Sequence, residues 1–329
     1  MKEKAIIIGS GIGGLAAAIR LSLKGYEPHL YEKNSENGGK IGELRLDGCR
    51  FDTGPSLFTL PLLVDELFTL AGENPREHFN YVPLASSCRY FWDDGALLNA
   101  WTDRNRFAEE AERVTGESRE KVLGFLDECA ELYELTSGIF IFSPFYQFDN
   151  FRKPESLNVA RNFRKLNAFS TMHGVISSRF KSPKLVQLFD RYATYNGSSP
   201  YRAPGTLNVI AHLEHNMGAF FPEGGMRDII RALEKLAVRC SVSLHNGSEV
   251  RSVVRDGSRI TGIETDDGFI PASVVISDVD VISFYRKLLK EEKPARRQEK
   301  QERSTSALIF YWSMKRRFEE LDLHNIFFS

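Results

Sequence analysis

Apolar and polar residues near the N-terminus follow a pattern that predicts a strand, a tight turn and a helix. Residues 5–8 are all apolar, as expected for a strand that is buried on both faces. Residues 15–23 are rich in alanine and leucine and end shortly before Gly25, as a helix would. A second short strand is predicted over residues 28–31. The turn between the first strand and the helix carries the glycines Gly9, Gly11, Gly13 and Gly14.

The spacing of these glycines suits the first turn of a dinucleotide-binding fold. Gly9 permits the tight turn, Gly11 lets the backbone approach a pyrophosphate without an intervening Cβ, and Gly14 lets the helix pack closely on the strand. The N-terminus of the helix then offers N–H groups and a positive dipole end to the phosphates. An ordinary strand-to-helix turn is the alternative. The strand before the turn, the helix after it and an acidic residue further on favour nucleotide binding.

That acidic residue is Glu32, which ends the second strand about 20 residues after the glycines, where a carboxylate would hold a ribose hydroxyl. A carboxylate here would repel a 2′-phosphate, so NADP is disfavoured. FAD and NAD both carry a free ribose, and these residues do not separate them. The polar loop from Lys33 to Lys40 follows, and its Gly38-Gly39 pair with the cation of Lys40 suits a second phosphate. A hairpin turn is the alternative for this loop.

The rest of the chain alternates between helical and strand patterns. Residues 42–46 and 49–52 flank Asp47-Gly48, which is a strong hairpin signal. The predicted helices cover residues 57–72, 104–137, 206–217 and 227–238, and Leu123, Leu126, Ala130 and Tyr133 are expected on the core face of the second. Short strands are predicted within 81–102 and strands over 241–245, 273–277 and 306–314. A β-meander is predicted at 249–255, 259–265 and 269–272.

The composition is that of a globular protein and argues against several classes. At 329 residues the chain is long enough for two domains, and its formal net charge of -1 argues against a nucleic-acid binder. The four cysteines are far apart, which indicates neither a zinc site nor a redox pair and suits reduced thiols in the cytoplasm. His212 and His215 share one helix face without a third ligand, so we expect a solvated helix surface and no metal. We also expect no signal peptide and no membrane-spanning helix, since no apolar run approaches ~20 residues.

Residues 139–184 differ in character from the rest of the chain. Aromatic residues alternate there with lysines and arginines, and acidic residues are scarce. This combination suits a surface that rests on anionic lipid headgroups and inserts apolar side chains at the acyl boundary. The alternatives are a solvated lid over an aromatic core and, less favoured, the stacking of single-stranded nucleic acid. We therefore expect a cytoplasmic protein that associates peripherally with a membrane.

A set of short motifs extends over the whole chain: Gly38-Gly39-Lys40, Phe51-Asp52-Thr53-Gly54-Pro55-Ser56, Glu66-Leu67-Phe68, residues 194–200, Ala203-Pro204, residues 221–226, Ser277-Asp278-Val279-Asp280 and residues 324–329. Together they resemble the bacterial phytoene desaturase family, which are FAD-dependent carotenoid desaturases with a flavin amine-oxidase-like fold. Where the family usually has an arginine, this sequence has Lys40, which keeps the charge and loses the bidentate fork.

The resemblance implies an α/β fold with a Rossmann-type FAD-binding domain, a parallel central sheet and a β-meander, formed by residues 1–75 and 220–305. Residues 76–219 and 306–329 would form an inserted, helix-rich substrate or lid region that faces the membrane. Asp149 is expected near the acidic catalytic position of the family, and a solvent-exposed aspartate is the alternative. The residues expected to bind FAD are Gly9, Gly11, Gly13, Gly14, Glu32, Lys33, Gly38, Gly39, Lys40, Gly54, Pro55, Ser56, Val250 and Asp278.

The activity that the resemblance implies is the introduction of C=C double bonds into a long apolar carotenoid precursor, as in phytoene desaturases. The sequence leaves the electron acceptor open between oxygen and a quinone. A hydroxycarotenoid 3,4-desaturase, or a flavin-dependent carotenoid isomerase or saturase, would use the same cofactor residues. A non-catalytic lipid binder of the Rab escort or GDP-dissociation-inhibitor type shares the architecture without a working flavin site. The family continues beyond the length of this chain, so we expect an incomplete enzyme that lacks the part closing over the flavin.

Overall fold

The computed structural model describes residues 2–143 and 154–329. The chain divides into two compact units, Met1–Val82 with Phe221–Glu302, and Pro83–Phe220 with Arg303–Ser329. The assignment of FAD binding to the first part of the chain and substrate binding to the second stays a prediction. Asp149, the expected catalytic residue, lies outside the described residues.

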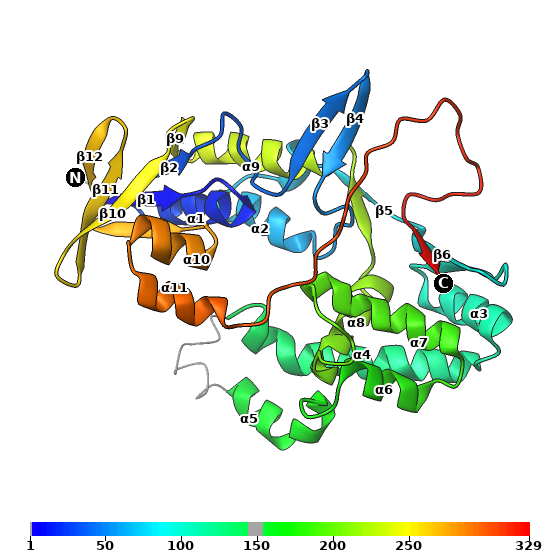
Figure 1. Cartoon of the computed structure of the whole chain (residues 1–329). Helices are drawn as coiled ribbons and strands as arrows, with labels where there is room; N and C mark the ends of the chain where they lie inside the picture. The colour runs from blue at the N-terminus through cyan, green and yellow to red at the C-terminus, as the bar shows by residue number, and fades with distance from the viewer. Residues whose placement is uncertain (1, 144–153) are drawn as a thin grey trace. The chain divides into compact units, whose positions relative to one another are not determined.

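A four-stranded parallel sheet forms the centre of the first unit (Figure 1). Its strands, in order across the sheet, are β13 (Val274–Ser277), β1 (Lys4–Ile8), β2 (Glu27–Glu32) and β9 (Ser243–Asn246). Ile6 pairs with Val275 on one side and with His29 on the other. Ala5, Ile6 and Ile7 are completely buried, as the continuous apolar run predicts for a strand covered on both faces.

Two helices pack against each other beside this sheet, α1 (Ile12–Leu23) and α9 (Arg227–Arg239). The strand, turn and helix predicted at the N-terminus are confirmed. Helix α9 turns a strongly apolar face inward, and the predicted buried positions are confirmed, since each is at most 2% exposed: Ile229, Ile230, Leu233 and Leu236.

Two antiparallel elements complete the strands predicted for this unit. The hairpin of β3 (Gly42–Leu46) and β4 (Cys49–Thr53) turns at Asp47 and Gly48, both with positive φ, as the Asp-Gly pair predicts. The meander is confirmed, and its strands are β10 (Val250–Asp256), β11 (Arg259–Thr265) and β12 (Gly268–Pro271).

The helix predicted over residues 57–72 is shorter in the structure, where α2 spans Leu62–Leu70. Pro61 precedes its first residue, and Leu60 adopts a φ of 51°, which a right-handed helix cannot contain. The remaining elements of this part of the chain are η1 (Pro75–Glu77), α10 (Val281–Ser283), η6 (Phe284–Leu288), α11 (Glu292–Glu299) and the paired strands β5 (Tyr81–Pro83) and β8 (Phe220–Pro222).

The second unit combines a small sheet with helices. In the sheet, β6 (Ser86–Trp92) pairs antiparallel with β7 (Leu97–Trp101) and parallel with β14 (Asn325–Phe328). The helices are α3 (Arg104–Thr115), α4 (Arg119–Phe140), α5 (Pro154–Arg161), η3 (Phe163–Leu166), α6 (Met172–Arg179), α7 (Pro183–Asp190), η4 (Arg191–Asn196), η5 (Gly205–Asn208) and α8 (Val209–His215).

The helical region predicted over 104–137 is two helices, because Gly116 ends α3 with a φ of 74°. The predicted core face is also displaced. Of its four residues only Leu126 is completely buried, whereas Leu123, Ala130 and Tyr133 are half-buried. Helix α4 packs against both α3 and α8, so its buried face is wider than one stripe. Further buried residues of α4 include Val122, Phe125, Cys129 and Leu132.

The strand predicted over residues 306–314 is wrong. This segment has no strand structure, and none of the strands in the described residues pairs with it. Leu308 is 82% exposed and Trp312 is 74% exposed. An apolar β-pattern forms a strand only when a neighbouring strand accepts its backbone hydrogen bonds, and the pattern itself does not supply that neighbour.

None of the described helices combines the length and the apolar character needed to cross a membrane.

Candidate functional site

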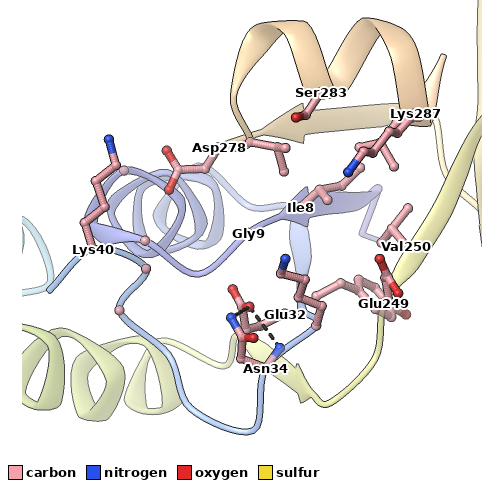
Figure 2. Close-up of a pocket in the computed structure, with 18 of the residues that line it drawn as sticks. Ile8, Gly9, Glu32, Asn34, Lys40, Glu249, Val250, Asp278, Ser283 and Lys287 are labelled. Carbon is pink, nitrogen blue, oxygen red and sulfur yellow. Dashed lines mark hydrogen bonds between the residues drawn. The ribbon is translucent and has the colours of Figure 1, made fainter. Parts of the chain in front are cut away.

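A pocket of about 690 Å³ lies at the carboxyl ends of β1 and β2 in the first unit (Figure 2). It is lined by the glycine-rich turn after β1, the end of β2, the loop 38–41, the start of β10 and residues 278–288 after β13. The carboxyl ends of parallel strands are where open α/β sheets bind ligands. The sheet therefore brings together segments that are far apart in the sequence.

The glycine-rich turn brings backbone directly to the wall of the pocket. Gly9 has a φ of 96°, and a Cβ on Gly14 would overlap the carbonyl oxygen of Gly9, so the turn depends on glycine at both positions. Gly9, Gly11 and Gly13 line the pocket, whereas Gly14 supports the turn from within. The first N–H groups of α1 have no partner within the helix and therefore suit an anion.

Glu32 is fixed at the end of β2 by four hydrogen bonds and is 6% exposed. Its Oε2 accepts from the backbone N–H of Ser10 at 3.0 Å and from the Ser10 hydroxyl at 2.9 Å. Its Oε1 accepts from the backbone N–H of Asn34 at 3.0 Å and from the Asn34 side-chain amide at 2.7 Å, as Figure 2 shows. The carboxylate thus has a defined orientation, and two of its four donors are side chains that can move.

The second glycine pair lies directly on the first turn. The N–H of Gly38 donates to the carbonyl of Ser10 at 2.9 Å. Gly39 has a φ of 57°, and a Cβ on it would approach the Cα of Gly11 to 3.3 Å. Gly38, Gly39 and Lys40 all line the pocket, so the loop predicted to meet a second phosphate shares one cavity with the first turn.

The carboxylate of Asp278 lies over the glycine-rich turn. Its backbone N–H donates to the carbonyl of Ile8 at 2.8 Å, which continues the pairing of β13 with β1. A Cβ on Gly11 would overlap Oδ2 of Asp278, and a Cβ on Gly13 would lie 2.6 Å from Oδ1. In the view of Figure 2, Asp278 lies on the opposite side of the turn from Glu32.

Other predicted residues divide between the pocket and its surroundings. Lys33 and Val250 line the pocket, whereas Gly54, Pro55 and Ser56 do not. Gly54 has a φ of 100°, and a Cβ on it would overlap the carbonyl oxygen of Lys40, so this glycine lets its strand end approach the loop. The cofactor roles of all these residues stay predictions.

Sequence reasoning missed several polar residues that line the pocket, among them Asn34, Arg251, Ser283 and Lys287. Asn34 follows Glu32 by two residues, and its side-chain amide donates to the Glu32 carboxylate, so a short polar residue just after the acidic strand end is a recognisable signal. Ser283 and Lys287 come from α10 and η6, and no local pattern distinguishes them from an ordinary helix surface.

The second unit contains a buried polar cluster around Glu214, which is 1% exposed. Its carboxylate accepts from the hydroxyls of Ser87 at 2.6 Å and Tyr192 at 3.1 Å, and from Tyr195. Arg191 lies 3.4 Å away and forms the ion pair. Burial alone would raise the pKa of Glu214, but Arg191 and the hydrogen bonds outweigh it and hold this pKa below its usual range.

The expectation that His212 and His215 lie on a solvated helix face is wrong for His215, which is 1% exposed. Its ring stacks on Phe107 with 4.1 Å between ring centroids, and Nε2 lies 2.7 Å from the hydroxyl of Tyr192. Burial lowers the pKa of His215 from 6.5 to about 4, against the attraction of Glu214. His212 is half-buried and stacks on Tyr133. A spacing of three residues indicates a shared face, but it does not say whether that face meets solvent.

The parallel sheet, the glycine-rich turn and the acidic residue at the end of β2 are features of the nucleotide-binding α/β folds. The family model of the flavin containing amine oxidoreductases matches residues 12–326, and the chain belongs to this family. The expected α/β fold class is confirmed. Two solved structures show the same fold at low identity. An oxidoreductase from Methanosarcina mazei has a TM-score of 0.59 and 19% identity, with 87% of this chain and 61% of that chain covered. A putrescine oxidase has a TM-score of 0.58 and 15% identity, with 87% and 60% covered.

Curated relatives confirm the resemblance to carotenoid-modifying enzymes. A 1-hydroxycarotenoid 3,4-desaturase of Flavobacterium sp. (strain P99-3) is 41% identical over 99% of this chain and 67% of the relative. A 4,4'-diapolycopene oxygenase of Methylomonas sp is 31% identical over 99% of this chain and 66% of the relative. The chain thus spans about two thirds of the length of the curated relatives it matches.

Proposed function

We propose that this chain binds FAD in the pocket of the first unit and takes part in the desaturation of a hydroxylated carotenoid. The observation that carries the proposal is the convergence of Glu32, the glycine-rich turn and the loop 38–41 on one cavity. Membership of the flavin-containing family favours FAD over NAD, which the glycines and Glu32 leave open. The relative with 41% identity, a 1-hydroxycarotenoid 3,4-desaturase, favours this reaction over the desaturation of phytoene.

The residues at the pocket fit the parts of FAD. Ribose hydroxyls can replace the side-chain donors of Ser10 and Asn34 on the Glu32 carboxylate, while the backbone donors keep that carboxylate in place. The N-terminus of α1 and the bare backbone of Gly11 and Gly39 suit a pyrophosphate. The ammonium group of Lys40 offsets its charge.

Asp278 needs a different contact from the phosphates, because two anions repel each other. Its carboxylate lies over Gly11 and Gly13, and we propose that it accepts hydrogen bonds from hydroxyl groups of the cofactor. Val250, at the start of β10, offers an apolar surface to the adenine ring.

Desaturation removes a hydride and a proton from adjacent carbons and leaves a C=C bond. When bound, FAD supplies the hydride acceptor, a role that no protein side chain can take. This chain's residues bind and orient the cofactor and present its anionic groups to the turn and the loop. The proton acceptor is proposed to be Asp149, which lies outside the described residues. The final electron acceptor is proposed to be oxygen or a quinone.

The cofactor proposal is tested by the spectrum of the purified chain and by one variant. We expect a yellow protein that releases FAD on denaturation. Gly11→Val adds a branched side chain at the wall of the pocket, where its Cβ would overlap the carboxylate of Asp278, so FAD should be lost while the far-ultraviolet circular dichroism stays that of the unaltered chain. A Gly11→Val variant that retains stoichiometric FAD contradicts the proposed site, and a colourless chain that binds NAD contradicts the proposed cofactor.

The substrate proposal is tested by incubating the FAD-loaded chain with a 1-hydroxycarotenoid, with phytoene and with a poly-cis carotene, followed by chromatography. We expect a new double bond in the hydroxycarotenoid only. Conversion of phytoene would favour the phytoene desaturase activity instead, and isomerisation of the poly-cis carotene would favour an isomerase. A flavin-loaded chain that binds all three and converts none would contradict the proposed reaction for this chain, and it would fit a non-catalytic carrier and an incomplete enzyme equally.

We also propose that residues 139–184 contact a membrane surface, since the substrate class is insoluble in water. Several aromatic residues of this segment are exposed, among them Phe169 at 91%, whereas Phe180 is buried in the core. Arg164 in η3 adds positive charge beside them, whereas the charge of Lys165 is paired with Glu131.

Sedimentation with vesicles tests this contact. Binding should increase with the fraction of anionic lipid and decrease with salt, because screening weakens the attraction of lysine and arginine. Phe169→Ser should weaken the binding several-fold. Phe269→Ser, at a residue in β12 of the first unit that is 53% exposed, serves as the matched control and should not change it. Equal sedimentation with neutral and anionic vesicles would leave the solvated lid as the explanation.

A further inference from the structure

Arg227 is the first residue of α9, and its side chain is nearly buried, at 9% exposure. Its Nη1 donates to two backbone carbonyls, that of Asn37 and, at 2.9 Å, that of Ile41. These carbonyls stand at the two ends of the loop 38–41, which lines the nucleotide pocket. Arg227 itself is not among the described residues that line the pocket. One guanidinium group therefore connects the two ends of this loop by hydrogen bonds.

The loop is adapted to this arginine. Gly38 has a φ of 121°, and a Cβ there would overlap Nη1 of Arg227 and lie 2.7 Å from the carbonyl oxygen of Ile41. Its N–H donates to Ser10, and its carbonyl accepts from the N–H of Ile41 at 3.0 Å. The loop is thus held between the glycine-rich turn on one side and the guanidinium group on the other. Any side chain at position 38 would displace the guanidinium group of Arg227 or the carbonyl group of Ile41.

The charge of Arg227 is only weakly compensated. Its Nη2 lies 3.3 Å from the carboxylate of Glu36, whose side chain is 76% exposed and therefore largely screened by water. The other partners of the guanidinium group are neutral carbonyls. A positive charge in a buried position acts over longer distances than one in water, so the loop 38–41 lies in a positive potential. Position 40 carries a lysine without a planar fork, and Arg227 supplies a guanidinium group to the same loop from another element.

We propose that Arg227 is a positioning residue for the pyrophosphate of the bound dinucleotide. It holds Gly38, Gly39 and Lys40 in the conformation that meets a phosphate and adds positive potential behind them, without touching the ligand. This inference rests on the proposed function, because it concerns the same pocket. Neither the motif spacing nor the composition assigns a role to this arginine.

The experiment compares the affinity for FAD, ADP and adenosine in the 329-residue chain and its variants, with ADP and adenosine measured by displacement of FAD. Arg227→Met should weaken the binding of ADP and of FAD at least tenfold and should change the affinity for adenosine less than twofold, because only ADP and FAD carry a pyrophosphate. Arg227→Lys should recover part of the loss, since it restores the charge without the fork. Arg239→Met, on the same helix and paired with Glu73, is the control and should bind as the unaltered chain does.

Glu36→Gln provides a second test that does not disturb a buried group. Removing this carboxylate leaves the charge of Arg227 less compensated, so ADP should bind about threefold more tightly at low salt, and the gain should disappear at high salt. This variant decides the question if Arg227→Met does not fold. The proposal is overturned if a folded Arg227→Met variant keeps its ADP affinity, or if it loses affinity for ADP and for adenosine equally. It is also overturned if Glu36→Gln has no effect on ADP binding. A chain that binds neither FAD nor ADP before any substitution contradicts the proposed function instead.

Discussion

Glu32 in the first unit and Glu214 in the second are both buried carboxylates with several hydrogen-bond donors, but their partners come from different places. Glu32 takes all four donors from Ser10 and Asn34, which belong to the adjacent turn and to its own strand end. Glu214 takes its partners from β6 and η4, more than a hundred residues apart in the chain. The first carboxylate could be predicted from the sequence, and the second could not.

The two carboxylates also differ in how their charge is stabilised. Glu32 has no ion-pair partner among the described residues and relies on uncharged donors, two of which a ligand can replace. Glu214 is paired with Arg191 and surrounded by tyrosine hydroxyls. A carboxylate with exchangeable donors suits binding, whereas one in a closed network suits structure. Variants at the two sites should therefore affect different measurements.

The largest effect is expected for Glu214→Gln, which leaves the buried charge of Arg191 without its partner. We expect the free energy of unfolding to decrease by about 3–5 kcal/mol, as for other broken buried ion pairs. Denaturant unfolding measures it. Glu73→Gln, which breaks the more exposed pair with Arg239, is the control and should cost less than about 1 kcal/mol. Similar losses in the two variants would contradict a structural role that is specific to the buried cluster.

The next effect concerns the pH dependence of stability. Burial lowers the pKa of His215 from 6.5 to about 4. Between these values the unfolded chain binds a proton that the folded chain does not, so the stability that neutral His215 provides is complete above pH 6.5 and is lost as the pH falls to 4. The loss should be on the order of 3 kcal/mol.

Unfolding at several pH values, compared between the unaltered chain and His215→Gln, isolates this contribution. The comparison is needed because burial also lowers the pKa of His212 and of His245. Parallel pH profiles for the two proteins would show that His215 does not titrate in this window.

A smaller effect, on binding, is expected for Glu32→Ala. Loss of the hydrogen bonds between the carboxylate and the ribose should weaken FAD binding by about 1.5–3 kcal/mol. Flavin fluorescence titration measures it. Glu27→Ala, at the exposed start of the same strand, should leave FAD affinity unchanged. If Glu32→Ala instead unfolded the chain as readily as Glu214→Gln, the distinction between a binding and a structural carboxylate would fail.

The smallest expected effect is on stability, and it distinguishes a glycine inside a helix from the glycines of the pocket. Gly124 lies inside α4, and a Cβ there would meet no atom within 4 Å. Gly124→Ala should therefore stabilise the chain by about 0.5–1 kcal/mol through helix propensity. Gly39→Ala, with a φ of 57° and Gly11 close by, should destabilise the loop and weaken FAD binding. A stabilising Gly39→Ala would show that the loop does not need its positive φ.

Much of the first unit could be predicted because its signals are local. The run of residues 5–8, the glycine spacing and Glu32 lie within about thirty positions, and each depends on backbone geometry that neighbouring residues impose. The meander was predicted for the same reason, since Asp-Gly turns at 256–257 and 267–268 fix the strands on either side. The predicted segment 306–314 failed because strand formation needs a partner that local pattern cannot provide.

By itself the sequence determined the parallel strands, the glycine-rich turn after β1 and the carboxylate that ends β2, because short-range backbone constraints act wherever the chain folds. Only the tertiary structure decided which distant groups meet. It placed Lys287 at the pocket, Arg227 behind the loop 38–41, and His215 and Glu214 in the core. These placements depend on packing between elements, and the charge and burial of a side chain follow from that packing and not from its neighbours in sequence.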